Sequence, residues 1–220
     1  DIILVPIFTI MIGGAVGLLV GPPISNFMLA LGELINWAVD KQPVIMGILV
    51  SVLMGMILTL PISSAALAII LNLSGLAGGA ATVGCCANMV GFAVASFKEN
   101  GISGLISQGL GTSMLQVPNI MKKPIIWLPA FIASAILGPI STVVLHMTNN
   151  ASGAGMGTAG LVGQLMTWQD MSGSEDGVVL IIKIILLHFI LPGLIAWVTS
   201  YIMRKKGLIK DGDMKLESST

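Results

Sequence analysis

The chain has few charged residues. Asp, Glu, Lys and Arg together make up 9% of its 220 residues, whereas a soluble domain usually carries roughly 25%. The ten basic and ten acidic residues cancel to a net charge of zero, so the chain offers no basic face to nucleic acid. Hydrophobic residues account for 55% of the chain, and the mean hydropathy is +0.98. This composition excludes a soluble globular domain and a nucleic-acid-binding protein.

Cysteine and histidine are equally scarce. The two cysteines, Cys85 and Cys86, are adjacent, which suits neither a metal site nor a disulfide framework, so we expect them to be reduced and buried. The sequence contains no catalytic triad, zinc site or Walker loop, and the glycine-rich tract 153–160 lacks the Lys-Ser/Thr of a phosphate loop. We therefore expect no cofactor and no metal ion. An intramembrane enzyme is poorly supported, because acid, base and nucleophile candidates do not cluster.

The start of the chain carries no targeting signal that we can identify. It begins at Asp1 without Met, and its first apolar run has neither a basic n-region nor a cleavage-site pattern. A signal peptide is therefore not expected. We expect instead that the sequence begins inside a longer membrane protein.

Long apolar stretches are what the chain does contain. Several of them reach the roughly 20 residues that a helix needs to cross a bilayer, so we predict an all-α integral membrane protein with several spans. The expected spans are 2–20, 43–60, 80–97, 124–147 and 178–203. The first is expected to stop at Gly21-Pro22-Pro23, before a helix over 24–39. In that helix, Glu33 is either an interfacial residue or a carboxylate that faces a cavity.

Basic residues predict the orientation of the spans. Arg204, Lys205 and Lys206 follow the last span and place the C-terminus in the cytoplasm by the positive-inside rule. The same rule, applied to Lys41 and Lys98, places both of these lysines in the cytoplasm. The more polar segment 101–121 is expected to lie at the membrane interface. The two halves of the chain then have the same orientation, and they are inverted if this segment crosses.

The chain is divided by these features into three parts. They are an N-terminal transmembrane and amphipathic part (1–42), a central part with several spans (43–203) and a charged cytoplasmic tail (204–220). The tail is expected to be disordered from residue 210 onward. Four aromatic side chains lie near the predicted span ends, where amphipathic rings favour the membrane interface. They are Trp127, Trp168, Trp197 and Tyr201.

Two segments of the central part, residues 43–203, are variants of one another. Residues 61–83, the first segment, and 139–161, the second segment, are identical at nine of 23 aligned positions. Each contains Asn-x-Ser-Gly and several glycines within an otherwise apolar stretch. Duplicated, broken hydrophobic segments are typical of the substrate site of a transporter. We therefore predict two duplicated re-entrant hairpins.

The chemistry of these segments favours a neutral polar ligand. An unpaired backbone group in hydrocarbon costs several kcal/mol, so a helix break survives only beside protein or a watered cavity. Glycine lets a ligand approach the backbone, and Asn and Ser side chains supply donors and acceptors for a sugar-like polyol. The second segment is the richer in polar residues. The predicted substrate-binding residues are Asn72, Ser74, Gly75, His146, Asn149, Asn150, Ser152, Gly153, Thr158 and Gln164.

Structural interpretations of the same residues stay open. Glycines four apart, as in Gly75-x-x-x-Gly79, also permit close helix packing without any ligand. The asparagines are harder to explain by packing, since a buried amide needs several partners. His146 is either a ligand contact or a satisfied helix histidine, and His188 in its apolar run is better explained as structural.

Three stretches carry a resemblance to a known family. They are PISSAALAIILNLSGLAGGAA, VPNIMKKPIIWLPA and ASGAGMGTAGLVGQ. With them the chain, from residue 2 to about residue 203, resembles the EIIC-like membrane proteins of the bacterial sugar phosphotransferase system. The nearer likeness is to the perfringolysin-regulator (PfoR-type) branch.

The resemblance implies a multi-pass protein of the bacterial inner membrane, in which two hairpins pack against a scaffold and move relative to it. It also implies an EIIB-type partner that donates a phosphoryl group, and a homodimer. The chain departs from the family pattern in two ways: it lacks the Gly-Ile-Thr-Glu type motif of glucose-family members, and it has no EIIA or EIIB domain of its own. Any phosphoryl transfer would therefore be done by separate partners.

Two functional hypotheses follow. The first is a membrane transporter that moves a small polar, sugar-like solute between the two hairpins. The alternative is a membrane regulator or sensor that keeps the EIIC-like fold without transporting.

Overall fold

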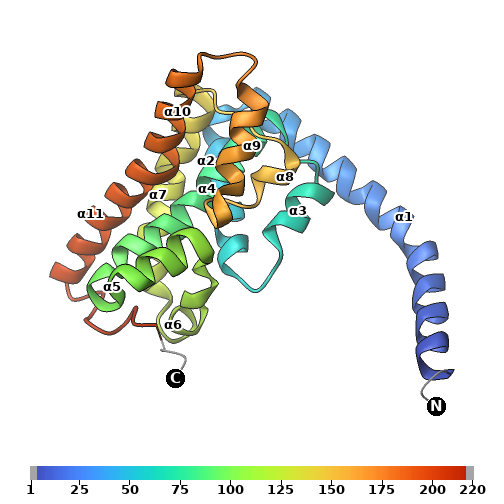
Figure 1. Cartoon of the computed structure of the whole chain (residues 1–220), viewed down its shortest axis with the longest axis horizontal. Helices are drawn as coiled ribbons and strands as arrows, with labels where there is room; N and C mark the ends of the chain where they lie inside the picture. Colours follow the sequence, from blue (N-terminus) through green and yellow to red (C-terminus); the bar gives the residue numbers. More distant parts are fainter. Residues whose placement is uncertain (1–3, 217–220) are drawn as a thin grey trace.

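The computed structural model describes residues 4–216, and every regular element in this range is helical (Figure 1). This confirms the predicted all-α class. The α-helices are α1 (Leu4–Lys41), α2 (Pro43–Thr59), α3 (Ser64–Ile70), α4 (Gly75–Ala95), α5 (Phe97–Ile106), α6 (Val117–Lys122), α7 (Leu128–Pro139), α8 (Ala151–Ala154), α9 (Val162–Met171), α10 (Gly177–Ile185) and α11 (Leu191–Lys205). Short 3₁₀ or π segments are Ser107–Gly111, Ser113–Gln116, Pro124–Trp127, Ile140–Val144, Ala159–Leu161 and Leu186–Ile190.

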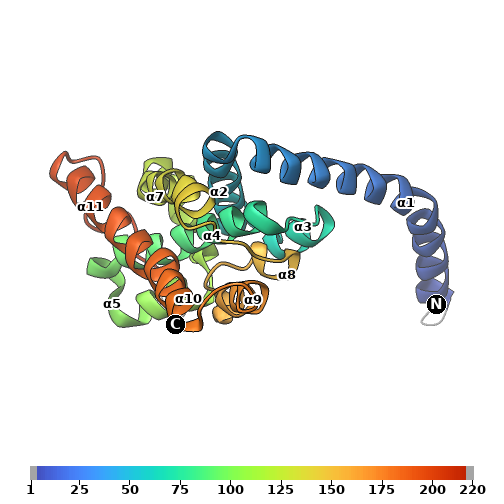
Figure 2. The ribbon, with the colours of Figure 1, turned by 90° about the horizontal axis from the view of Figure 1, so that it is seen from above.

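Helix α4 lies at the centre of the bundle, against α2, α7 and α11 (Figures 1 and 2). Nearly all of its side chains are buried. Its many small residues let neighbouring backbones come close: a Cβ on Gly84 would lie 1.8 Å from the carbonyl oxygen of Ser51. Cys85 and Cys86 are free and buried in α4, as predicted.

Three helices of the described residues are long and apolar enough to cross a membrane. They are Gly75–Ala95, Pro124–Val144 and Gly177–Lys205, and the shorter apolar helix α2 accompanies them. The predicted start of the third span at residue 80 is wrong, since α4 already begins at Gly75. Gly78 and Gly79 lie inside this helix, where a Cβ would meet the carbonyl oxygens of Asn149 (2.3 Å) and Met147 (1.9 Å). These glycines therefore serve close packing inside α4, and they do not break it.

The packed glycines also give the directions of the helices. Along α2 and α4, Ser51 meets Gly84, and Gly55 meets Asn88 further on, so the two helices run in the same direction. Along α2 and α7 the order reverses, since Gly47 meets Gly138 while Ser51 donates a hydrogen bond to the carbonyl of Ser134. Helix α7 therefore runs opposite to α2 and α4.

The prediction that Lys41 and Lys98 lie on the same side is wrong for this reason. Lys41 precedes α2 and Lys98 follows α4, and two parallel helices put these lysines at opposite ends of the bundle. The chain between α2 and α4 returns along α3 to start α4 at the end where α2 began (Figure 1). Residues 101–121 do not cross the bundle: they fold into α5, short helical turns and α6 at the end where α4 stops.

Helix α1 runs through Gly21-Pro22-Pro23, so the predicted stop there is wrong. Proline bends a helix more readily than it ends one when neighbours or solvent satisfy the freed groups, and α1 is bent (Figures 1 and 2). Its first half extends away from the bundle. Its second half packs closely, because Gly32 lies against the carbonyl oxygen of Leu71. Glu33 is exposed.

The C-terminal tail is ordered through residue 216, so the predicted disorder from residue 210 is wrong for this part. The tail folds back under α5 and α6, and the side chain of Met214 is fully buried. Its carbonyl oxygen accepts hydrogen bonds from Asn100 (2.8 Å) and Gln116 (2.9 Å). A bidentate ion pair between Arg204 and Glu99 anchors the turn that leads into the tail.

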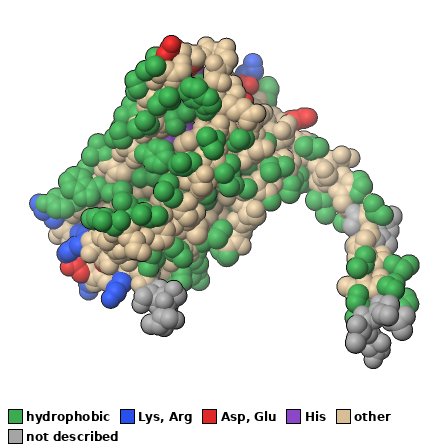
Figure 3. Space-filling model, viewed as in Figure 1, with side chains coloured by type: hydrophobic (Ala, Val, Ile, Leu, Met, Phe, Trp, Pro, Cys, Tyr) green, Lys and Arg blue, Asp and Glu red, His purple; other side chains and the backbone are tan. Residues whose placement is uncertain are grey.

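Ion pairs hold the acidic residues of the tail. Asp211 lies 2.7 Å from Lys98, and Asp213 lies 2.5 Å from Lys123. The hydrogen bond and positive charge of Lys98 hold the pKa of Asp211 below its ordinary value. Partial burial acts to raise the pKa of Asp213, but hydrogen bonds from the side chain of Lys123 and the backbone of Lys210 outweigh it and lower this pKa. Basic side chains are gathered at this end of the molecule (Figure 3).

Candidate functional site

The two similar segments meet at their helix breaks. The backbone N–H of Asn149, in the second segment, donates a hydrogen bond to the carbonyl oxygen of Gly75, in the first (3.2 Å). The two residues form an isolated antiparallel β-bridge. Both breaks use left-handed backbone, with φ of 48° at Asn72, 57° at Gly75 and 47° at His146. We call this meeting point, residues 72–75 with 147–150, the junction.

Helix α1 fixes the first segment at the junction. The side-chain amide of Asn36 donates to the carbonyl oxygen of Asn72 (2.9 Å), and its oxygen accepts from the N–H of Ser74 (3.4 Å). Asn72, Ser74 and Gly75 are themselves exposed. The first segment is therefore held by its backbone, and its polar side chains stay accessible. The sequence marks Asn36 as a polar residue in a helix but gives no hint of this role.

The asparagines of the second segment serve the fold. Asn149 is fully buried, and its amide donates to the hydroxyl of Thr82 (2.8 Å) and to the carbonyl of Gly163 (3.1 Å). The side chain of Asn150 caps α8 by accepting from the N–H groups of Ser152 and Gly153, each at 3.1 Å. The capacity of both amides to accept or donate is largely used within the protein.

Two predicted site residues, Thr158 and Gln164, lie away from the junction, and a third, His146, directly precedes it. Thr158 donates its hydroxyl to the carbonyl of Gly109 at the far end of α4. Gln164 is buried in α9, with its amide nitrogen 3.3 Å from Nδ1 of His188. His146 is exposed and not helical, so the helix-histidine alternative is wrong. The structure thus gathers eight of the ten predicted residues at the junction or within three residues of it: Asn72, Ser74, Gly75, His146, Asn149, Asn150, Ser152 and Gly153.

A cleft lies between the segments at the other end of α3. Its volume is about 160 Å³. Ser64 of the first segment donates its hydroxyl to the carbonyl of Gly155 in the second (2.7 Å). The lining residues are Leu58, Ile62, Ser63, Ser64, Ala65, Met89, Gly111, Thr112, Met114, Gly155, Met156 and Ala159. None of these residues is charged.

The polar groups of the cleft are hydroxyls and backbone groups. The hydroxyl oxygens of Ser63 and Thr112 each accept one backbone N–H, from Ala66 (3.2 Å) and Met114 (3.1 Å). A hydroxyl that accepts in this way keeps its own proton for donation to a ligand. Sequence reasoning missed these residues. The one signal was the Pro-Ile-Ser shared by the starts of both segments, which includes Ser63.

A buried polar network ties α2, α4 and α7 together beside the cleft. The side-chain oxygen of Asn88 accepts from Nε1 of Trp127 (2.8 Å) and from the hydroxyl of Thr59 (3.3 Å), while its amide donates to Ser134 (3.3 Å). The predicted interfacial position of Trp127 is therefore wrong, since its ring is buried at 9% exposure. Polar side chains in apolar helices often hold neighbouring helices together in this way. Trp168, Trp197 and Tyr201 are exposed, which agrees with their prediction.

These helices, with their apolar outer faces and broken central segments, define a polytopic helical membrane protein. A family model described as "Phosphotransferase system, EIIC" matches residues 1–216. The chain therefore belongs to this family, which confirms the EIIC-like resemblance. Family membership implies an integral membrane protein of bacteria with a place in sugar uptake and a possible EIIB partner. Searches of curated proteins and of solved structures found no match.

Proposed function

We propose that this chain is a transporter that moves a small polar, sugar-like solute between the two broken segments. The observation that carries the proposal is their mutual contact. The first segment follows α2 and the second follows α7, which runs in the opposite direction, and the segments touch at Gly75–Asn149 and at Ser64–Gly155. Inverted repeats whose broken helices face each other are typical of transporter substrate sites. On this basis the segments are two re-entrant hairpins of inverted orientation.

The cleft supports a neutral solute. Its hydroxyls, from Ser63, Ser64 and Thr112, and the backbone of Gly111 and Gly155 offer both donors and acceptors. A cation would call for carboxylates, and the cleft has none. A sugar or another polyol fits this combination of hydroxyls, backbone groups and aliphatic walls.

The junction has a separate role in the proposal. Asn72 and Ser74 are exposed there and contact the solute along its path. Asn149, Asn150 and Gly153 keep the second segment in its broken form, so that the path between the segments stays open to polar groups. The part of the chain from residue 43 to residue 203 forms the transport domain.

We propose that the end of the bundle with Lys98, Lys123 and Arg204 faces the cytoplasm, because the positive-inside rule places such clusters there. The acidic turn with Glu175 and Asp176 then lies outside. The cytoplasmic end carries the C-terminal tail. An EIIB-type protein is the partner expected there, and a second copy of the chain is expected beside it, both on the basis of family membership.

Thermal-shift measurements on the purified protein in detergent test the proposal. A ligand that binds the folded state alone stabilises it by mass action, so one class among sugars and polyols is expected to raise the melting temperature. The variant Ala65→Leu fills the cleft and is expected to abolish this rise. Ala135→Leu, a half-buried site on α7 outside the cleft, is the matched control and is expected to keep it. Absence of a rise with every solute class would contradict the proposal.

In the alternative function, a regulator or sensor, the cleft binds the solute but the protein does not transport it. The PfoR-type resemblance is the observation in its favour. Stabilisation by a sugar together with an absence of flux in proteoliposomes would favour this alternative.

A further inference from the structure

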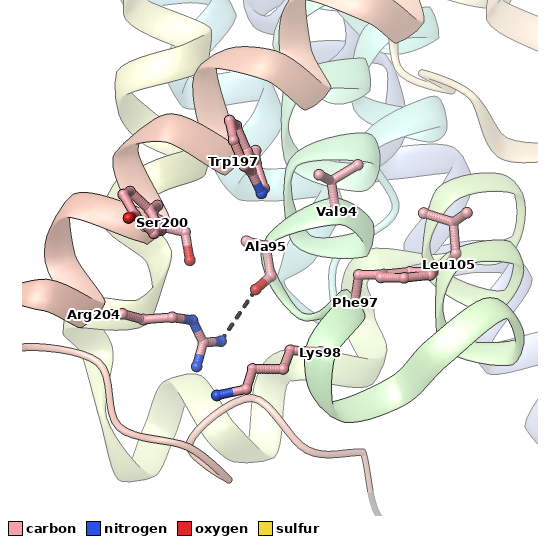
Figure 4. Close-up of a pocket in the computed structure, with 9 residues that line it drawn as sticks. Val94, Ala95, Phe97, Lys98, Leu105, Trp197, Ser200 and Arg204 are labelled. Atoms are coloured by element: carbon pink, nitrogen blue, oxygen red, sulfur yellow. Dashed lines mark hydrogen bonds between the residues drawn. The ribbon is translucent and has the colours of Figure 1, made fainter.

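A second, larger hollow lies on the outer surface of the bundle, between the end of α4 with α5 and the end of α11. Its volume is about 690 Å³. Figure 4 shows Val94, Phe97 and Leu105 on one side of it and Trp197 on the other. Lys98 and Arg204 lie together at one end of the hollow. We call it the lateral groove. Its walls are apolar over most of their length, and its charge is confined to one end.

Helix α11 contributes Trp197 and Tyr201 to one wall of the lateral groove. Lys205 does not line the groove, but it follows Tyr201 by four residues, as Tyr201 follows Trp197, which places all three on one face of the helix. The rings of Trp197 and Tyr201 stack with centroids 6.0 Å apart, and Nζ of Lys205 lies 4.8 Å from the centroid of the Tyr201 ring. The two rings are about half exposed, at 54% and 50%. An apolar and aromatic surface thus leads directly to a cationic group.

The groove lies beside a helix whose apolar face is largely exposed. The helix Gly177–Lys205 is long enough to cross a membrane, yet only 33% of its most apolar stretch is buried inside the protein. Trp and Tyr side chains with adjacent Lys and Arg are the usual composition of a helix end at the membrane surface. The apolar part of the groove therefore lies at the depth of acyl chains, and its basic end lies at the depth of headgroups.

The basic end carries excess positive charge. Glu99 pairs with Arg204, and Asp211 pairs with Lys98, so these four groups balance. Lys205 and Lys206 follow on the same helix end and are exposed, which leaves two positive charges beside the groove. Cationic groups just beyond a membrane helix attract anionic lipid headgroups, at about 1 kcal/mol for each Lys or Arg near the surface.

We propose that the lateral groove binds one anionic phospholipid. Its acyl chains lie against Val94, Phe97 and Trp197, and its phosphate lies beside Lys98 and Lys205. A sugar would find few polar partners on these walls, and a free phosphate would gain nothing from them. Only an amphipathic anion uses both parts of the groove. This site is separate from the cleft between the two segments, and it does not depend on transport.

Native mass spectrometry of the full chain in detergent tests the site, with phosphatidylglycerol, with phosphatidylcholine of the same acyl chains, and with inorganic phosphate. The wild type is expected to retain one phosphatidylglycerol in preference to phosphatidylcholine, and inorganic phosphate is expected not to displace it. Lys205→Gln is expected to weaken phosphatidylglycerol retention about fivefold, the equivalent of one Lys near an anionic surface. Its control is Lys41→Gln, an exposed lysine at the other end of the bundle with the same change of charge.

A second pair of variants tests the apolar wall. Val94→Phe fills the groove and is expected to reduce retention of both phospholipids. Val179→Phe, on the exposed face of α10, is the matched control and is expected to leave retention unchanged. Equal retention of the two phospholipids by the wild type would overturn the proposal, as would equal effects of Lys205→Gln and Lys41→Gln or displacement by inorganic phosphate. The lysine pair decides the question even if Val94→Phe fails to fold.

Discussion

The two similar segments use identical residues for different purposes. Gly75 needs to be glycine for its backbone, since its φ is +57° and a Cβ there would meet nothing within 4 Å. Its counterpart Gly153 needs to be glycine for packing, because a Cβ would lie 2.4 Å from Cβ of Met166. Asn72 is exposed, whereas its counterpart Asn150 caps a helix. A shared sequence motif therefore marks where the chain breaks, while the surroundings decide what each residue does there.

A substitution at the contact between the two segments is expected to cause the largest loss of unfolding free energy. Gly79→Ala puts a Cβ 1.9 Å from the backbone oxygen of Met147, and a backbone atom of the second segment can move only if the junction moves. Overpacking of this kind costs about 3 kcal/mol. Gly13→Ala, in the extended half of α1 where a Cβ meets nothing within 4 Å, is the control and is expected to be neutral or slightly stabilising. Unfolding in mild detergent measures both. Equal stability of the two variants would break the claim that the segments pack tightly.

Substitutions of the asparagines in the two segments are expected to have the second-largest effect on stability, and the effect is expected to differ between the segments. Asn149→Ala removes two donated hydrogen bonds in a buried site and is expected to cost about 2 kcal/mol of unfolding free energy. Asn72→Gly removes an exposed side chain while keeping the left-handed backbone accessible, so its expected cost is below about 0.5 kcal/mol. The same unfolding assay compares them. A larger loss in Asn72→Gly than in Asn149→Ala would show that the first segment depends on this side chain for its fold.

The two serines near the segment starts are expected to respond in opposite ways when they are replaced by alanine. Ser63 caps α3 by accepting from the N–H of Ala66, and Ser63→Ala is expected to cost about 1 kcal/mol. Its counterpart Ser141 has a buried hydroxyl without a hydrogen-bond partner. Ser141→Ala is therefore expected to be neutral or stabilising, because it removes an unsatisfied polar group. Destabilisation by Ser141→Ala would mean that its hydroxyl has a partner, such as a water or a solute.

A fall in pH is expected to have the smallest effect. It is expected to loosen the C-terminal tail and to leave the junction unchanged. The lowered pKa values of Asp211 and Asp213 mean that their ion pairs stabilise tail docking above the ordinary carboxyl pKa, and this contribution is lost as the pH falls through the lowered values. The protection of the amides of residues 210–216 against hydrogen exchange, taken relative to the intrinsic exchange rate at each pH, is therefore expected to fall at acid pH. The junction is held by backbone groups that do not titrate, so the N–H of Asn149 is expected to stay protected. Equal loosening of both would show that the tail and the junction open together.

Much of the architecture could be predicted from the sequence. The scarcity of charge predicted a membrane protein, and the repeated Asn-x-Ser-Gly predicted where the chain breaks. The close approach of Gly75 and Asn149 agrees with that pattern. These successes depend on composition and on local sequence, which act before any tertiary contact forms.

The missed features depend on contacts between distant residues. Nothing local shows that Gly78 and Gly79 stay helical because Met147 and Asn149 pack on them. Likewise, the burial of Trp127 requires Asn88 as its hydrogen-bond partner, 39 residues away. The charged tail reads as disordered until Lys98 and Lys123 are placed beside it. The cleft was missed because its polar groups, Ser63 and Thr112, are ordinary helix caps in the sequence.

Solute counterflow in proteoliposomes tests the central claim, that the two segments form a path for a polar solute, most directly. The solute that stabilises the protein in the thermal-shift screen is loaded inside, and uptake of the labelled solute is measured. The account predicts uptake by the wild type and by Ala135→Leu, and its loss in folded Ala65→Leu. Uptake by Ala65→Leu at the wild-type rate would contradict the account.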